Sequence, residues 1–311
     1  MQTQHADTFR EAVTAVLGAP PDPAPLEAEV LDVVAADGFR REHIKFQVSP
    51  ADWSYAYLLV PDNLDKPAPV IYAHHRHENA FSLGKSEIIG LAGDGNQAIG
   101  LELVQRGFIV FAPDAICFEE RRSPVSTGDS FDQAYNFYQL SLRLLRGETL
   151  LKKILSDVSR GLDYLETRPE VDVHNIGFMG CGYGANMALW SAAMEPRIRA
   201  AAAHGGIMTY REQVKRGGWF QPEFVVPRLV QVADIPHIVS MIAPRACLLS
   251  TVGSDEQTLD ATEIYQKALP TYQAQGTANR LSLYQYPGDG TFDQRMRFNA
   301  YTWLESWLKF S

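Results

Sequence analysis

The stretch Ile176-Gly177-Phe178-Met179-Gly180-Cys181-Gly182-Tyr183-Gly184-Ala185-Asn186 decides the fold of this 311-residue chain. It starts as an apolar strand, passes through a turn with a glycine at every second position, and continues into an Ala-rich helix. A G-x-nucleophile-x-G turn between a strand and a helix exposes its central side chain, and the flanking glycines let helix and strand approach closely. The stretch therefore predicts a nucleophile elbow. Its central residue, Gly182, is expected to have a strained backbone with positive φ.

Short apolar runs on both sides of this turn predict a parallel sheet. Runs without alternation are typical of strands buried on both faces, and they occupy residues 69–73, 108–112, 176–179 and 246–250. Residues 201–206 read as the end of a further strand. Helical patterns alternate with them over 96–106, 150–167, 185–193, 258–275 and 294–310. Two strands precede them, at 44–48 and 55–60. This order favours an α/β fold with an open, mostly parallel, doubly wound sheet and antiparallel N-terminal strands over a (β/α)8 barrel.

The chain divides into a short arm and one large domain. Residues 7–17 read as a helix that ends at the Gly- and Pro-rich stretch 18–25, so residues 1–25 are interpreted as an N-terminal helical arm. Residues 26–311 are predicted to form a single domain. Within it, residues 207–240 carry several aromatic side chains and are expected to cap the pocket.

Composition excludes several classes of function. The formal net charge is −9, from 28 basic and 37 acidic residues. A chain this acidic lacks the basic surface that nucleic-acid binding requires. No apolar run is long enough for a membrane span, and the polar start shows no signal peptide. The three cysteines are too scattered for a disulfide framework, so a cytoplasmic location is expected. A small-molecule substrate or ligand is the expected partner. The sequence leaves open whether the chain forms a homodimer.

Together these motifs resemble a known family. The elbow, Pro69–His77, Gly84-Lys85-Ser86-Glu87, residues 106–114, Phe118–Arg122 and Ile242-Ala243-Pro244-Arg245 are similar to segments of α/β-hydrolases of the dienelactone hydrolase and acetyl xylan esterase-like branch. The resemblance covers about residues 27–311. It implies the α/β-hydrolase fold, a Ser–His–acid triad, and an oxyanion hole made by the loop after the first buried strand and the residue after the nucleophile.

The chain departs from this family pattern at two of the three triad positions. Gly182 stands where the nucleophile is expected, and no G-x-S-x-G occurs anywhere. Gly290 stands where the family has its catalytic histidine, and the last histidine of the chain is His237. An acidic residue is present at the third triad position. The match to the family pattern is ambiguous by one residue, so this acid is either Asp255 or Glu256. Loss of the nucleophile or the histidine costs on the order of 10^6 in rate, so ordinary serine-esterase chemistry is unsupported.

Other side chains then have to supply any catalysis. His204 and His75 are predicted to move protons, with Asp255 as the orienting acid, because they follow predicted strands at the expected cleft. Cys181 could be a shifted nucleophile, although its neighbours on the turn favour a packed, inert thiol. The H-x-H segment at 75–77 could chelate a metal, but no metal and no cofactor are expected.

A second set of residues is predicted to contact the substrate. These residues follow predicted strands, flank the elbow, belong to the cap, or lie in the segment where the family has its histidine: Arg76, His77, Cys181, Tyr183, Tyr210, Trp219, His237 and Asp289. The structural alternative for each of them is an ordinary packed or ion-paired role. His74 is expected to be a structural histidine.

The sequence therefore predicts an atypical enzyme that keeps the pocket and the oxyanion hole but lacks the triad. Isomerisation, cyclisation or lyase-type chemistry on a small carbonyl-containing or acyl substrate is compatible with that site. One alternative is an ester or lactone hydrolase that uses Cys181 or an activated water. The other is a non-catalytic ligand-binding protein. An acid–base pair in the cleft favours an enzyme, whereas a sealed apolar cavity favours a receptor.

Overall fold

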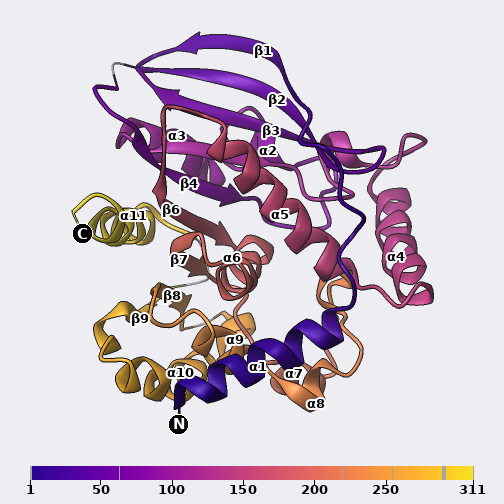
Figure 1. The fold of residues 1–311 in the computed structure, drawn as a ribbon, viewed down its shortest axis with the longest axis vertical. Helices are drawn as coiled ribbons and strands as arrows, with labels where there is room; N and C mark the ends of the chain where they lie inside the picture. Colours follow the sequence, from indigo (N-terminus) through magenta and orange to yellow (C-terminus); the bar gives the residue numbers. More distant parts are fainter. Residues whose placement is uncertain (1, 63, 219, 254, 289–291, 311) are drawn as a thin grey trace.

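The computed structural model describes residues 2–62, 64–218, 220–253, 255–288 and 292–310. In this part of the chain, nine strands form one sheet in the order β1-β2-β3-β5-β4-β6-β7-β8-β9 (Figure 1). The strands are β1 (Ala28–Ala36), β2 (Phe39–Ser49), β3 (Asp52–Pro61), β4 (Ala68–His74), β5 (Ile109–Pro113), β6 (Val171–Cys181), β7 (Ile198–His204), β8 (Ala246–Val252) and β9 (Leu281–Tyr286).

The first three strands are antiparallel, and the rest of the sheet is parallel. β1 pairs with β2, β2 with β3 and β3 with β5 in antiparallel register, whereas β5, β4, β6, β7, β8 and β9 run parallel. The predicted doubly wound sheet with antiparallel N-terminal strands is confirmed. The carboxyl ends of β4, β6, β7 and β8 meet at one edge, where ligands bind in open α/β sheets.

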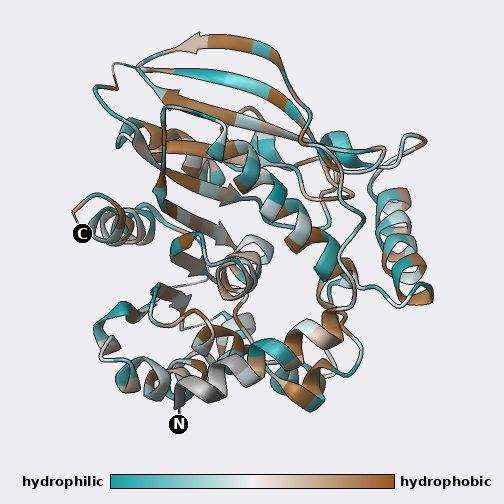
Figure 2. Ribbon diagram, in the orientation of Figure 1, coloured by the Kyte–Doolittle hydropathy of each residue, from teal (hydrophilic) through white to brown (hydrophobic). Residues whose placement is uncertain are grey.

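Helices cover both faces of this sheet (Figure 1). The longer ones are α1 (Gln2–Leu17), α3 (Ile99–Gln105), α4 (Asp129–Leu145), α5 (Leu150–Glu166), α6 (Tyr183–Met194), α10 (Ala261–Ala274) and α11 (Gln294–Leu308). The shorter ones are α2 (Lys85–Ile88), α7 (Tyr210–Lys215), α8 (Leu229–Val232) and α9 (Ile235–Ser240). Figure 2 shows apolar residues along the central strands, and also on the exposed edge strand β1.

Three elements were not anticipated. β1 has every residue exposed, because it is the outermost strand and no helix covers it. β9 is the opposite edge strand and is only partly buried. α4 follows β5 as a long helix with an amphipathic pattern, in a region for which no helix was predicted.

The N-terminal helix α1 packs into the molecule. Val13 and Leu17 are fully buried and belong to the main apolar core. Arg10 donates hydrogen bonds to the carbonyl oxygens of Ala193 and Met241, at the ends of α6 and α9. Residues 1–25 thus contribute a helix to the core, in addition to a Pro-rich connection to β1.

Among the described residues, no helix combines the length and apolar character that a bilayer crossing requires.

Candidate active site

The elbow is built as predicted. β6 ends at Cys181, and Gly182 follows with φ 58° and ψ −110° before α6 begins at Tyr183. The Gly182 N–H donates to the carbonyl oxygen of His204 at 2.9 Å, which ties the turn to the end of β7. The predicted positive φ at Gly182 is confirmed. A strained turn of this kind projects residue 182 out of the sheet edge.

The three glycines of the turn have different surroundings. A Cβ on Gly180 would overlap the backbone of Gly184, and a Cβ on Gly184 would overlap the carbonyl oxygen of His74. A Cβ on Gly182 would meet no described atom within 4 Å. Close packing therefore requires glycine at 180 and 184, whereas residue 182 faces open space.

That open space is a cleft of about 560 Å³ over the elbow. Its walls come from the loop after β4, the start of α6, the loop after β7, and the segment from α7 to Gln221. Polar groups dominate the lining: His77, Glu78, Asn79, Asn186, Gln213, Arg216, Gln221 and Glu256. The cleft is therefore a polar site of the size that small ligands occupy.

The loop after β4 contains two residues with left-handed backbone conformation. Glu78 has φ 47° and Asn79 has φ 55°, two consecutive left-handed residues without a glycine. The Asn79 N–H donates to His77 Nδ1 at 3.1 Å, which stabilises this conformation. Left-handed non-glycine residues cost free energy and cluster at functional sites. The loop is thus held against the cleft in a defined shape.

Tyr183 supplies a backbone donor to the cleft. It is the first residue of α6, so its N–H has no acceptor within the helix, and the positive end of the helix dipole lies there. Its ring is buried against the rings of His74, Phe118 and Phe224. Burial raises the pKa of its hydroxyl, so this group stays protonated.

His75 is engaged by the backbone through both ring nitrogens. Its Nδ1 lies 2.8 Å from the carbonyl oxygen of Arg76, and its Nε2 accepts from the Ala115 N–H at 3.1 Å. Burial lowers its pKa to about 4. The ring therefore fixes the loop after β4 to the end of β5 and does not line the cleft.

His204 lies at the end of β7, as expected, but on the side of α11. Its Nδ1 is 2.8 Å from Ser250 Oγ, and its ring stacks on Phe292 at 4.1 Å. Burial lowers its pKa to about 4. The ring is therefore neutral at physiological pH and lies beside the elbow strand, outside the residues that line the cleft.

The two candidates for the acid position, Asp255 and Glu256, lie differently with respect to the elbow and the cleft. Its Oδ2 lies close to Gly205, 3.6 Å from where a Cβ would stand, and Gly206 contacts the backbone of Gly182. Glu256 has a highly exposed side chain at the mouth of the cleft, 4.0 Å from Arg216. The carboxylate of Asp255 therefore lies close to the elbow, although Asp255 is not among the residues that line the cleft.

Cys181 is a packed thiol. It lies against the apolar cluster on the α11 side of the sheet, and burial raises its pKa to about 12. The thiolate is the reactive form, so this cysteine is unreactive at neutral pH. It is not among the residues that line the cleft.

The remaining predicted site residues divide into three groups. His77 and Tyr183 line the cleft. Arg76, Tyr210 and His237 do not: Arg76 forms a two-bond ion pair with Glu87 of α2, Tyr210 donates to the carbonyl oxygen of Phe224, and His237 takes part in the capping of α9. Trp219, Asp289 and Gly290 lie outside the described residues.

Two cleft features escaped the sequence analysis. Asn186 Nδ2 donates to the carbonyl oxygen of Gly206 at 2.7 Å and so connects α6 to the loop after β7. Glu223 is fully buried behind the cleft, where it accepts from Asn136 at 2.7 Å and lies 3.5 Å from His77 Nε2. Asn186 could have been noticed from its place in the elbow motif, whereas nothing in a polar cap segment marks Glu223 as buried.

A group of three carboxylates at the end of β5 surrounds a buried lysine. Asp114, Glu119 and Glu120 lie close enough together to hold a cation. The Lys85 ammonium fills that place, at 2.7 Å from Asp114, 2.7 Å from Glu119 and 2.6 Å from Glu120. These carboxylates raise the pKa of Lys85, so the amine stays charged. The cluster is an internal ion-pair network that joins α2 to the end of β5.

Comparison with known proteins agrees with this fold. Residues 85–234 match the Dienelactone hydrolase family. "Putative hydrolase YtaP" of Bacillus subtilis is 26% identical over 309 residues, which cover 96% of this chain and 98% of the relative. A "putative acetyl xylan esterase" of Bacteroides fragilis superposes with a TM-score of 0.73 at 19% identity, covering 90% of this chain and 74% of its own. A glucuronoyl esterase of Solibacter usitatus superposes with a TM-score of 0.67 at 14% identity, covering 98% and 91%.

Proposed function

We propose that this protein, an α/β-hydrolase-fold chain of the dienelactone hydrolase and acetyl xylan esterase-like branch, acts on a small carbonyl compound without a Ser–His–acid triad. An ester, a lactone or a related acyl compound would bind in the elbow cleft. One observation carries the proposal: the elbow is complete in backbone geometry, while its central residue, Gly182, faces an open cleft without a side chain.

The backbone of the elbow supports binding of a carbonyl oxygen. The Tyr183 N–H at the start of α6 is a backbone hydrogen-bond donor, so it does not depend on any side chain. It lies at the positive end of the helix dipole. Negative charge that develops on a bound carbonyl oxygen would be stabilised there. This support exists for an enolate as well as for a tetrahedral adduct, so it does not require a serine nucleophile.

We assign proton transfer at the elbow to Asp255, which lies beside the residues that line the cleft. His75 and His204 are buried, have lowered pKa values and hold backbone or side-chain partners. Asp255 lies beside Gly205 next to the elbow, and a carboxylate can act as a general base. Abstraction of a proton next to the bound carbonyl would give an enolate, which Tyr183 N–H would stabilise. Isomerisation, cyclisation and elimination all pass through such a step.

Hydrolysis by a bound water is the second candidate, and the relatives favour it. Their printed names describe hydrolases and esterases. The open space at Gly182 has room for a water where a serine oxygen would stand, and Asp255 on the neighbouring loop could accept its proton. The polar, open cleft argues for an enzyme over a sealed apolar receptor.

Active-site labelling tests the absence of a covalent nucleophile. The purified protein should not react with a fluorophosphonate probe, because residue 182 has no side chain. Mass spectrometry would locate any adduct. Stoichiometric labelling of a serine would overturn the proposal.

Turnover of esters and lactones separates the two candidates. In water enriched in 18O, hydrolysis by a bound water would place the label in the acid product. The Asp255→Asn variant would lose this hydrolytic activity. Carbonyl chemistry without hydrolysis would instead give an isomeric, cyclised or eliminated product without the label. No conversion of any carbonyl compound, with ligand binding intact, would point to the non-catalytic alternative.

A further inference from the structure

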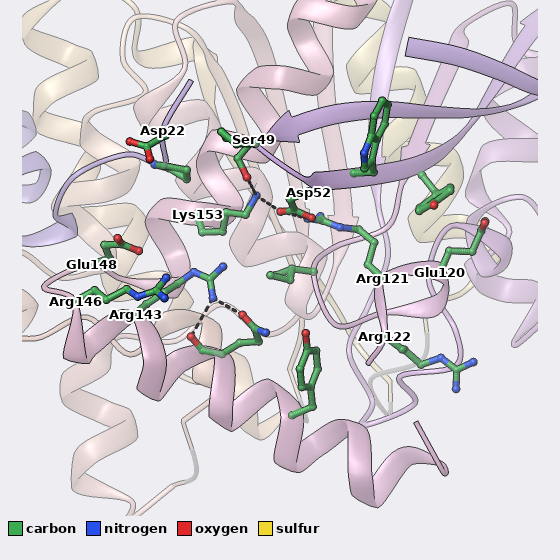
Figure 3. Close-up of a pocket in the computed structure, with 17 residues that line it drawn as sticks. Asp22, Ser49, Asp52, Glu120, Arg121, Arg122, Arg143, Arg146, Glu148 and Lys153 are labelled. Carbon is green, nitrogen blue, oxygen red and sulfur yellow. Dashed lines mark hydrogen bonds and ion pairs between the residues drawn. The ribbon is translucent and has the colours of Figure 1, made fainter. Parts of the chain in front are cut away.

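A second pocket, of about 590 Å³, lies apart from the elbow cleft and shares no lining residue with it. It is enclosed by the turn between β2 and β3, the C-terminal half of α4, the start of α5 and the Pro-rich connection at residues 21–22. In Figure 3, Arg143, Arg146 and Glu148 lie on one side, Glu120, Arg121 and Arg122 on the other, and Lys153 and Asp52 between them. We propose that this pocket binds a monoanionic organic carboxylate with a ring-shaped body.

Most charges of this pocket already have partners. Arg121 pairs with Asp157 at 2.9 Å and with Asp52 at 3.3 Å, while Lys153 pairs with Asp52 at 2.5 Å and with Asp157 at 2.6 Å. These two cations and two carboxylates neutralise one another. Glu120 pairs with Lys85 in the network beside the pocket. None of these groups needs a ligand.

Arg143 differs from them. It is half-buried, and among the described residues no carboxylate lies within ion-pair distance of its guanidinium. Its Nη1 donates to the carbonyl oxygen and Oε1 of Gln139, both in its own helix. Burial lowers the pKa of Arg143, so the pocket destabilises its charge. The remaining donors of the guanidinium fork suit a carboxylate, which would restore the lost solvation.

The rest of the lining limits the ligand to one negative charge and a flat body. Asp22 and Glu148 stand at the rim without an ion-pair partner among the described residues and would repel a second charge. Trp53, Tyr55, Tyr135 and Ile116 supply apolar and aromatic surface. Aromatic rings in a lining favour stacking with a planar or ring-shaped ligand.

Calorimetric titration with benzoate tests the assignment. Benzoate should bind, whereas benzamide, which lacks the charge, and phenyl phosphate, a dianion, should bind at least tenfold more weakly. Arg143→Gln should weaken benzoate binding at least tenfold, and Arg143→Lys should retain part of it. Lys66→Gln, at an exposed turn away from the pocket, is the matched control and should bind like the unchanged protein.

The outcomes that overturn the assignment are distinct from failure of the proposed function. The assignment is wrong if benzoate still binds with unchanged affinity to both Arg143 variants. It is also wrong if phenyl phosphate binds as tightly as benzoate, or if benzoate does not bind. Loss of binding in Arg216→Gln, with Arg143→Gln unaffected, would place benzoate in the elbow cleft instead. A thermal melt of each variant shows that it is folded, and Arg143→Lys keeps the test valid if Arg143→Gln does not fold.

Discussion

At the scale of single residues, the three glycines of the elbow should respond differently to the same added methyl group. Gly184→Ala would force a Cβ into the carbonyl oxygen of His74 and should cost more than about 3 kcal/mol of the free energy of unfolding. Gly182→Ala enters open space and carries only the strain of its positive φ, about 1–3 kcal/mol. Urea unfolding of the two variants measures the difference. Equal losses would show that close packing at Gly184 is not what requires glycine there.

The same comparison extends to activity. Gly182→Ser should fold with a similar small loss, because the hydroxyl points into the cleft. It should not gain ester hydrolysis of more than about tenfold, since residue 290 is also glycine and triad members act as a unit. A large gain from this single substitution would mean that another group already serves as the base.

Buried histidines should make the fold sensitive to acid. The pKa of His204 is lowered to about 4, below the value of about 6.5 expected for the unfolded chain. Between these two values the unfolded state binds more protons, so the free energy of unfolding falls as the pH decreases from about 6.5 towards 4. His204→Gln should reduce the slope of the free energy of unfolding against pH by up to about 1.4 kcal/mol per pH unit.

Urea titrations at pH 7.5, 6.0 and 5.0 on both proteins provide the measurement. The difference between the two proteins isolates this residue from His74 and His75, whose pKa values are also lowered by burial. A difference that is constant across this range would contradict the assignment of His204 as a buried neutral residue.

At the scale of elements, Lys85 connects α2 to the end of β5. Its ammonium contacts Asp114, Glu119 and Glu120, and it is fully buried. Lys85→Met would leave the buried Asp114 carboxylate without its cation and should cost about 3–5 kcal/mol of the free energy of unfolding. Lys66→Met, at an exposed turn, should change stability by less than about 0.5 kcal/mol. Similar small losses in both variants would mean that the network is solvated in solution.

At the scale of the whole molecule, α1 belongs to the core. Leu17 is fully buried and packs with the main apolar cluster. Leu17→Ala should therefore cost about 2–5 kcal/mol, whereas Glu11→Ala on the exposed side of the same helix should be close to neutral. Thermal and urea unfolding compare the two. If Leu17→Ala is also neutral, the N-terminal helix is a detachable arm.

The sequence by itself determined the central strands of the sheet and the elbow. Apolar runs without alternation mark the central strands, and glycines at 180, 182 and 184 mark the turn, because both signals are local along the chain. The identity of residue 182 alone shows that the centre of the elbow has no nucleophilic side chain. The exposed edge strand β1 lacked such a signal, because its neighbours in space, rather than its own pattern, make it an edge.

Only the tertiary structure decided which polar side chains share the cleft. His75 and His204 follow strands that end at the same sheet edge, yet the hydrogen bonds of their rings to Ala115 and Ser250 turn them away from the cleft. Asp255 lies against the loop after β7, whereas its neighbour Glu256 lines the cleft, and their adjacent places in the sequence do not reveal this difference. The direction of a side chain depends on partners distant in sequence, and spacing along the chain carries no record of them.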